Sequence, residues 1–272
     1  MKRLINRHPT RPLSLALGLL PFVLVLLVYL SASTARLAEN PDDRLLPSLS
    51  AMGESFHRLA TVENRRTGDI VLWVDTQASL SRLGLGVLIS ALLGLAVGVA
   101  TGLIPFVRRT FSPFVAVVSM IPPLAVLPIV FIAFGVGELS KVVLIVLGIA
   151  PFIMRDIQQR VEELPREQLT KAQTLGASTW QIGLRVVLPQ VLPRLLDAVR
   201  LSLGAAWLFL IAAEAIAATE GLGYRIFLVR RYLDMETILP YVMWISLLAV
   251  LLDLTLRLAT RMLFPWYRGG RS

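Results

Sequence analysis

The sequence predicts an all-α polytopic membrane protein with about six transmembrane helices. Hydrophobic residues make up 56% of the 272 residues and charged residues only 17%, with a mean hydropathy of +0.70. Soluble domains are typically about 45–50% apolar and about 25% charged. The chain also carries several apolar runs close to the roughly 20 residues that a helix needs to cross a bilayer. These runs and their loops leave no length for a large soluble domain.

The charge and the residue types exclude several classes of protein. The net charge of +9 would suit nucleic acid, but Lys and Arg lie between apolar runs rather than on one solvated face, so we expect no nucleic-acid partner. Cys is absent and the two histidines are His8 and His57. We therefore expect no disulfide, no metal site, no catalytic residue and no cofactor in this chain.

The N-terminal part contains the first transmembrane helix and a polar loop. The apolar run 13–30 follows four basic residues, Lys2, Arg3, Arg7 and Arg11. Residues 1–35 are therefore predicted to form a cytoplasmic tail and a first transmembrane helix. A signal peptide is the alternative, but its apolar region usually has about 7–15 residues, which is shorter than this run. Residues 36–80 read as an external loop with a short amphipathic helix near Leu49–Leu59.

The remaining chain, 81–264, is predicted to be a core of five spans followed by a tail at 265–272. The apolar runs lie at 83–104, 113–134, 140–154, 195–218 and 238–258. Six spans place both termini on one side of the membrane. Basic residues gather at both ends of the chain, where they include Arg257, Arg261, Arg268 and Arg271, and in the long segment 158–194. The positive-inside rule therefore predicts that both termini and this segment are cytoplasmic.

Small residues recur at every fourth position of the second span. They are Gly86, Ser90, Gly94, Gly98 and Gly102. On a helix this stripe lets another backbone approach closely. Packing inside the subunit and contact with a second copy both remain open.

Prolines interrupt the third span. Pro122, Pro123 and Pro128 each lack a backbone donor, and Met120 precedes them. The carbonyls that such a break frees are tolerated in a membrane only against protein or a water-lined cavity. These four residues are therefore candidates for a translocation pathway, with a purely structural kink as the alternative.

Two carboxylates lie within or beside later spans. Glu214 sits in an apolar helix about 21 Å beyond Arg200, and an intramembrane carboxylate is a functional candidate, so it joins the pathway candidates. Its alternative role is a hydrogen bond to a neighbouring helix. Asp253 lies four residues before Arg257, and this spacing predicts an ion pair on one helix face.

The segment 158–194 predicts an elbow of two short helices. Pro165 suits the first turn of a helix that runs to Leu175, and Gly176 can end it with a positive φ. Ser178 can then cap a second helix, which is expected to stop before Pro189. An exposed elbow of this kind indicates a docking surface for a soluble partner.

These residues resemble a known family. Ala172, Gly176, Val186, Leu188 and Pro189 match the spacing of the cytoplasmic "EAA" loop of binding-protein-dependent ABC importer permeases. The sequence departs from that loop at its first two positions, where Thr170 and Lys171 replace Glu and Ala. The departure removes the carboxylate of the family's pattern but keeps the elbow.

Further segments are similar to the nitrate/sulfonate/taurine-type branch of that family, and the resemblance runs collinearly over about 45–267. They are Ile121 to Pro128, Phe134 to Glu138, Ala212 to Glu214, Gly221 to Gly223, and Pro265-Trp266.

The resemblance implies a type I importer permease in the bacterial inner membrane, with 36–80 as a periplasmic loop. It implies a homodimer, two ATPase subunits that hold ATP and Mg²⁺, and a periplasmic binding protein that delivers a sulfonate, taurine, nitrate or a related solute. Carried over by position, the ATPase-coupling loop contains Thr170, Lys171, Ala172, Gly176, Ala177, Ser178, Trp180, Leu188 and Pro189. The chain has no Walker A sequence, so ATP hydrolysis is expected in the partner. An ion-coupled secondary transporter is the alternative function.

Overall fold

The computed structural model describes residues 9–41, 43–64 and 68–267. Within these ranges the regular structure is helical, apart from one isolated β-bridge between Glu63 and Ile70. His8 lies outside the described residues. So do five of the basic residues used for the membrane orientation, namely Lys2, Arg3, Arg7, Arg268 and Arg271.

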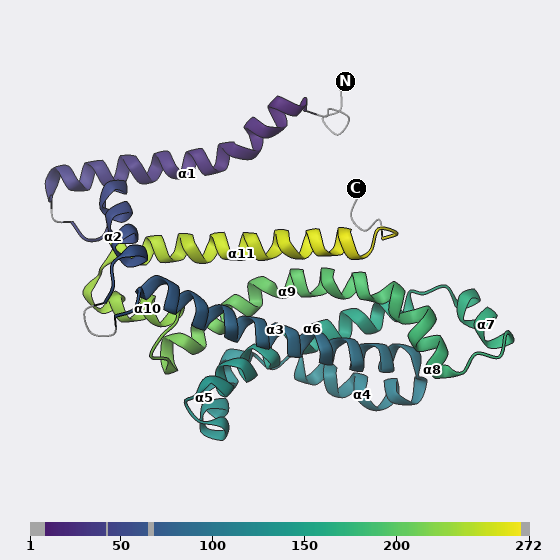
Figure 1. Ribbon diagram of the computed structural model, residues 1–272. Helices are drawn as coiled ribbons and strands as arrows, with labels where there is room; N and C mark the ends of the chain where they lie inside the picture. The colour runs from purple at the N-terminus through teal and green to yellow at the C-terminus, as the bar shows by residue number, and fades with distance from the viewer. Residues whose placement is uncertain (1–8, 42, 65–67, 268–272) are drawn as a thin grey trace.

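Five long helices run roughly along one axis (Figure 1). They are α1 (Arg11–Glu39), α3 (Val71–Leu103), α6 (Glu138–Glu162), α9 (Leu188–Ala217) and α11 (Met235–Leu263). The shorter helices between them are α2 (Leu49–Thr61), α4 (Pro105–Val118), α5 (Pro123–Phe134), α7 (Arg166–Thr174), α8 (Thr179–Ile182) and α10 (Leu222–Val229). A π-helical turn, Gly183–Val187, joins α8 to α9, and a 3₁₀ turn, Arg230–Tyr232, follows α10.

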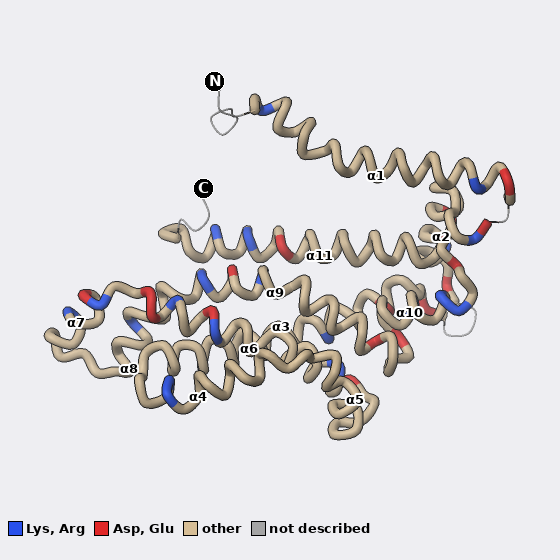
Figure 2. The backbone as a smooth tube through the Cα atoms, turned by 180° about the vertical axis from the view of Figure 1, so that it is seen from behind, with Lys and Arg blue, Asp and Glu red and all other residues tan. Residues whose placement is uncertain are grey.

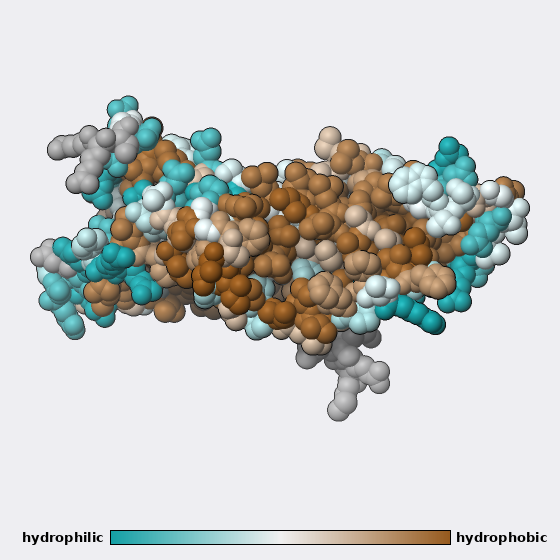
Figure 3. All heavy atoms as spheres, turned by 90° about the horizontal axis from the view of Figure 1, so that it is seen from below, coloured by the Kyte–Doolittle hydropathy of each residue, from teal (hydrophilic) through white to brown (hydrophobic). Residues whose placement is uncertain are grey.

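The molecule has two polar ends and an apolar middle. We call the end with α7 and α8 the elbow end and the end with α2 and α10 the α10 end (Figure 1). Lys, Arg, Asp and Glu gather toward these ends (Figure 2), and a continuous apolar band covers the middle of the face shown in Figure 3. This distribution is what a protein surrounded by lipid requires.

The described residues hold four helices long and apolar enough to cross a membrane, where the sequence predicts about six. These are α1, α3, the α8–α9 unit Thr179–Ala217, and α11; α4 and α5 would add a fifth if the bent pair counts as one span. The run 140–154 lies inside α6, where Lys141, Arg155 and Asp156 interrupt the apolar sequence. The run 113–134 is not one straight span, because α4 and α5 meet at 97°.

Helical structure enters the predicted loop 36–80 at both ends. The first helix continues to Glu39 and α3 begins at Val71, while α2 takes the place of the predicted amphipathic helix. The first turns of α3 contain polar side chains that are buried against other helices, among them Asp75, Thr76 and Ser79. Their partners come from the far end of the chain, so the local sequence reads as a loop.

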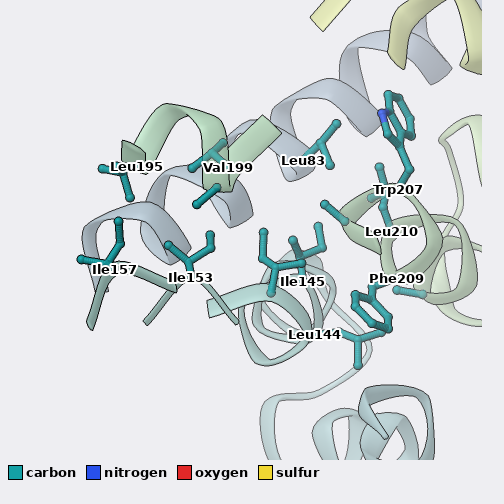
Figure 4. Packing of buried hydrophobic residues seen from close by; sticks show 14 of the residues in the cluster. Leu83, Leu144, Ile145, Ile153, Ile157, Leu195, Val199, Trp207, Phe209 and Leu210 are labelled. Atoms are coloured by element: carbon teal, nitrogen blue, oxygen red, sulfur yellow. The ribbon is translucent and has the colours of Figure 1, made fainter. Parts of the chain in front are cut away.

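The core is formed by α3, α6 and α9 (Figure 4). The small-residue stripe of α3 faces branched side chains of α6. A Cβ atom added at Gly94 would lie 2.3 Å from Cγ2 of Ile153, and one at Gly98 would lie 2.6 Å from Cβ of Ile157. The structure thus places the stripe at a helix contact inside the subunit.

The first helix stands apart from this core. Its apolar window is unburied, and its contacts concentrate at the α10 end, where Tyr29 Oη donates to the carbonyl of Pro47 at 2.6 Å and Ser33 Oγ to that of Leu46 at 3.0 Å. From there α1 runs back alongside α11, so that the start of α1 and the end of α11 both point toward the elbow end (Figure 1).

Candidate functional site

The elbow has the geometry that its sequence predicts. Gly176 adopts a φ of +80° and ends α7, a left-handed conformation that disfavours side chains. Ser178 then caps α8 with a capping box, in which its Oγ accepts from the amide of Gln181 and the Gln181 side chain accepts from the amide of Ser178. These local bonds fix the turn between the two helices.

The second helix of the elbow does not end where the sequence predicts. The short helix does not stop before Pro189 but passes through the π-helical turn into α9. In that turn the amide of Leu188 bonds to the carbonyl of Gly183, five residues back. Pro189 lies directly after this turn, in the first turn of α9. Gln190 also bonds Gln168 at 3.0 Å and ties α9 to α7.

The outer surface of the elbow is accessible and partly apolar. Leu175 is 80% exposed and Trp180 is 74% exposed. Around them Thr170, Lys171 and Ser178 are exposed, whereas Ala172, Ala177, Leu188 and Pro189 are half-buried. Exposed large hydrophobic side chains at a polar end of a membrane protein are typical of a surface that another protein covers.

The chain breaks where the prolines interrupt the third run. Residues between Val118 and Pro123 leave the helix, and Met120, which is 78% exposed, and Pro122 lie on the outside of the bend. Pro128 is exposed within α5, and Pro123 is half-buried at its start. One side chain bridges from this break to α6: Arg155 Nη1 donates to Ser119 Oγ at 3.1 Å.

Glu214 is fully buried in a polar cluster at the α10 end of the molecule. It accepts hydrogen bonds from Ser79 Oγ at 2.8 Å, from Arg82 Nη1 at 2.8 Å and from the amide of Gly223 at 2.8 Å. Arg82 also donates to Glu138 at the start of α6, at 2.9 Å. A buried carboxylate requires such compensation, because burial removes its hydration.

A second buried carboxylate completes the cluster. Asp75 accepts from the amide of Gly221 at 2.9 Å, from Arg225 Nε at 2.8 Å and from Tyr241 Oη at 3.0 Å. The polar cluster therefore joins α3, α6, α9, α10 and α11; its members are Asp75, Ser79, Arg82, Glu138, Glu214, Gly221, Gly223, Arg225 and Tyr241. It fixes the turn that connects α9 to α10.

Two glycines are required by the close approach of that turn. Gly221 has a φ of +124°, and a Cβ atom there would lie 2.6 Å from Cδ of Glu214. A Cβ atom at Gly223 would lie 2.8 Å from the carbonyl oxygen of Ile211. Both contacts are far below ordinary packing distance, so the segment Gly221 to Gly223 accepts no side chain at its two ends.

The structure separates Glu214 from the other pathway candidates. Met120, Pro122, Pro123 and Pro128 lie at the α4–α5 break or on α5, whereas Glu214 faces the interior of the subunit. The geometry favours its alternative role as a hydrogen-bonding group. Sequence reasoning missed Asp75, Ser79 and Arg82, although their spacing places them on one helix face, which is a usable signal. Asp253 and Arg257 form the expected ion pair at 2.7 Å.

Comparison with protein families gives one match over most of the chain. Residues 86–269 match the family described as binding-protein-dependent transport system inner membrane component. The match covers the α4–α5 break and the elbow, and it includes Glu214 of the polar cluster.

Individual relatives are similar over about the same region. The taurine transport system permease protein of Escherichia coli (strain K12) is 39% identical over 199 residues, which are 73% of this chain and 72% of that protein. A putative aliphatic sulfonates transport permease protein of Bacillus subtilis (strain 168) is 32% identical over 198 residues, 72% of this chain and 71% of that protein.

A solved structure shares the fold. The structure titled as inward facing conformations of the MetNI methionine ABC transporter matches with a TM-score of 0.62. The match has 23% sequence identity and covers 70% of this chain and 95% of that chain.

Proposed function

The chain belongs to the family of inner membrane components of binding-protein-dependent transport systems, and from this premise we propose which solute it carries and how it is driven. It is a multi-pass permease of the ABC type. We propose that it imports a small sulfonate such as taurine, with nitrate or a related solute as the next choice. In this proposal it works in the bacterial inner membrane and receives the solute from a periplasmic binding protein.

The structure of the elbow supports the proposal that separate ATPase subunits drive transport. It combines a rigid, capped turn with two exposed hydrophobic side chains, Leu175 and Trp180. Tryptophan in particular is enriched at the centres of protein interfaces. The described segments provide helices but no phosphate-binding loop, so ATP and its Mg²⁺ would be held by two partner ATPases, one for each copy of a permease homodimer.

The positive-inside rule supports a cytoplasmic elbow and cytoplasmic termini. Arg166, Lys171, Arg185 and Arg194 all lie in or beside the elbow. This orientation puts α2, α10 and the polar cluster on the periplasmic side, where the binding protein would dock.

The path from the elbow to the periplasmic side runs through one continuous helical unit. Thr179–Ala217 begins in the elbow and carries Glu214 near its other end. Movement of a bound ATPase would therefore shift α9 and, through Glu214, the polar cluster that fixes the α9–α10 turn. This connection offers a physical route by which ATP-driven closure could open the outer side of the permease.

The ion-coupled alternative gains no support. The matching family and the named relatives are components of binding-protein-dependent or ABC transport. The two carboxylates that could have carried a coupling ion, Glu214 and Asp253, are both engaged with arginines.

Gly176→Leu is expected to weaken ATPase docking about tenfold while the permease still inserts and folds. A leucine at a φ of +80° costs about 1–2 kcal/mol, which corresponds to about a factor of ten if the elbow changes shape to relieve it. No atom outside the turn lies within 4 Å of the added Cβ, so the effect should be confined to the elbow. The measurement is recovery of the ATPase in a detergent pull-down of tagged permease expressed with its neighbouring genes.

Gly204→Leu serves as the control, because Gly204 is exposed on α9 and also has open space around it. It should recover as much ATPase as the unchanged chain. Failure of the unchanged chain to recover any ATPase would contradict the proposed function. Equal recovery by Gly176→Leu and Gly204→Leu would remove the elbow from the proposal.

A further inference from the structure

We propose that Arg155 is the residue that binds the anionic group of the solute inside the translocation path. The inference rests on the proposed function and adds a specific recognition site to it. The structure places Arg155 beside the α4–α5 break, where it contacts Ser119.

Arg155 lies away from both ends of its helix. It is about 25 Å along α6 from Glu138 and about 10 Å from Glu162. Phe152, one turn earlier on the same side of α6, is 54% exposed, and α4 contributes exposed Phe114 and Val117. Arg155 is itself exposed, and on its side of α6 it lies between exposed Phe152 and exposed Gln159.

No carboxylate in the described ranges lies within ion-pair distance of Arg155. Its neighbours on α6 are paired, because Asp156 contacts Arg160 at 3.5 Å and Glu162 contacts Arg108 at 3.2 Å. The hydrogen bond found for Arg155 goes to the neutral hydroxyl of Ser119. An arginine has five N–H donors, so most of the guanidinium remains available to a ligand.

The surface around Arg155 is unsuited to lipid. The α4–α5 break exposes Met120 and Pro122, and neither Pro122 nor the adjacent Pro123 can donate a backbone hydrogen bond. Irregular backbone at membrane depth is tolerated only against protein or a water-filled cavity, and intramembrane cations face the same surroundings. The break and the arginine are independent features, and both indicate a water-filled path along α4, α5 and α6.

The chemistry of the group selects the ligand. A guanidinium presents parallel N–H donors that match two oxygens of a sulfonate or a carboxylate, and it stays charged at any physiological pH. The Ser119 hydroxyl holds one nitrogen and thereby orients the others. Arg155 is therefore the binding residue for an oxyanion that passes the α4–α5 break, and Ser119 is its positioning residue.

Arg155→Met is expected to lower taurine transport by about tenfold or more, because hydrogen bonds to a charged group contribute about 1.5–3 kcal/mol. The assay uses proteoliposomes that contain the permease with its ATPase and binding protein. Binding-protein-stimulated ATP hydrolysis should persist, so the solute moved per ATP should fall. Arg155→Lys should restore part of the transport, since it keeps the charge but loses the paired donors.

Arg109→Met is the matched control, because Arg109 is an exposed cation of α4 that forms no ion pair with any residue that the structure describes. It should transport within about twofold of the unchanged chain, as expected for a surface charge. Transport by Arg155→Met equal to that of Arg109→Met would overturn the inference and leave the proposed function intact. Loss of the permease dimer in Arg155→Met would also overturn it, since the arginine would then pair with a second copy.

A labelling experiment tests the water-filled path directly. The chain has no Cys, so Arg155→Cys introduces a single thiol. We expect this thiol to react with a negatively charged, membrane-impermeant thiosulfonate. Leu254→Cys on α11 is the control at similar depth, about 13 Å from Leu263, and should not react. An Arg155→Cys thiol that reacts no faster than Leu254→Cys would contradict the assignment.

Discussion

Glu214→Ala is expected to destabilise the permease by about 3–5 kcal/mol, the usual cost of removing one partner of a buried ion pair. Glu214 is fully buried, and the side chain of Arg82 is only 3% exposed. Alanine would leave that guanidinium with Glu138 as its close partner and would free the amide of Gly223. The measurement is the thermal unfolding midpoint of the detergent-purified chain, which should fall by about 10 °C, together with the yield of monodisperse protein.

Two variants make this prediction specific. Glu214→Gln keeps one oxygen that can accept from Arg82 or Ser79, so it should fold with a smaller loss than alanine. Asp253→Ala removes a carboxylate whose side chain is 30% exposed and that pairs with Arg257 of the same helix and with Arg200 of α9. Such pairs contribute less than about 1 kcal/mol. The burial argument is wrong if Asp253→Ala lowers the midpoint as much as Glu214→Ala.

Gly94→Leu is expected to separate α3 from α6 and to prevent formation of the core. The added Cβ alone would lie 2.3 Å from Cγ2 of Ile153 and 3.4 Å from its backbone carbon. Overpacking in a tight contact costs about 1–3 kcal/mol even where side chains can move, and here backbone is close behind the side chain. We expect aggregation during purification, measured as loss of the monodisperse peak in size-exclusion chromatography.

The same helix provides the control for this substitution. Gly84→Leu places the same side chain on an exposed side of α3, where no atom lies within 4 Å of the new Cβ. It should purify normally. Gly94→Ala should show a milder defect that Ile153→Ala partly repairs, because the double variant removes the Cγ2 that causes the clash. Equal behaviour of Gly84→Leu and Gly94→Leu would contradict close packing at the stripe.

The parts of the fold that the sequence predicts correctly are those with local causes. The positive φ of Gly176 and the cap at Ser178 depend on residues within one turn, and both are present. The pairing of Asp253 with Arg257 is equally local. The membrane class also follows from the sequence alone, because composition and run length determine it.

The parts that the sequence does not predict depend on distant partners. Asp75 reads as a polar loop residue and Arg82 as a charge just before the predicted span 83–104, because their partners Arg225 and Glu214 lie more than a hundred residues later in the chain. The start of α3 at Val71 is missed for the same reason. The contact between Arg155 and Ser119 is likewise not apparent from the sequence, because it depends on the α4–α5 break 36 residues earlier in the chain.

The polar cluster affects the order in which the helices of this protein can assemble during synthesis. Arg82 precedes its partner Glu214 by 132 residues, and Asp75 precedes Arg225 by 150. At roughly 5–20 residues per second, the partners leave the ribosome about 7–30 s after α3 does. During that interval water or the insertion machinery must solvate the two charges. The start of α3, at the α10 end of the molecule, is therefore expected to be the last part of the bundle to reach its final place, although it is among the first to be made.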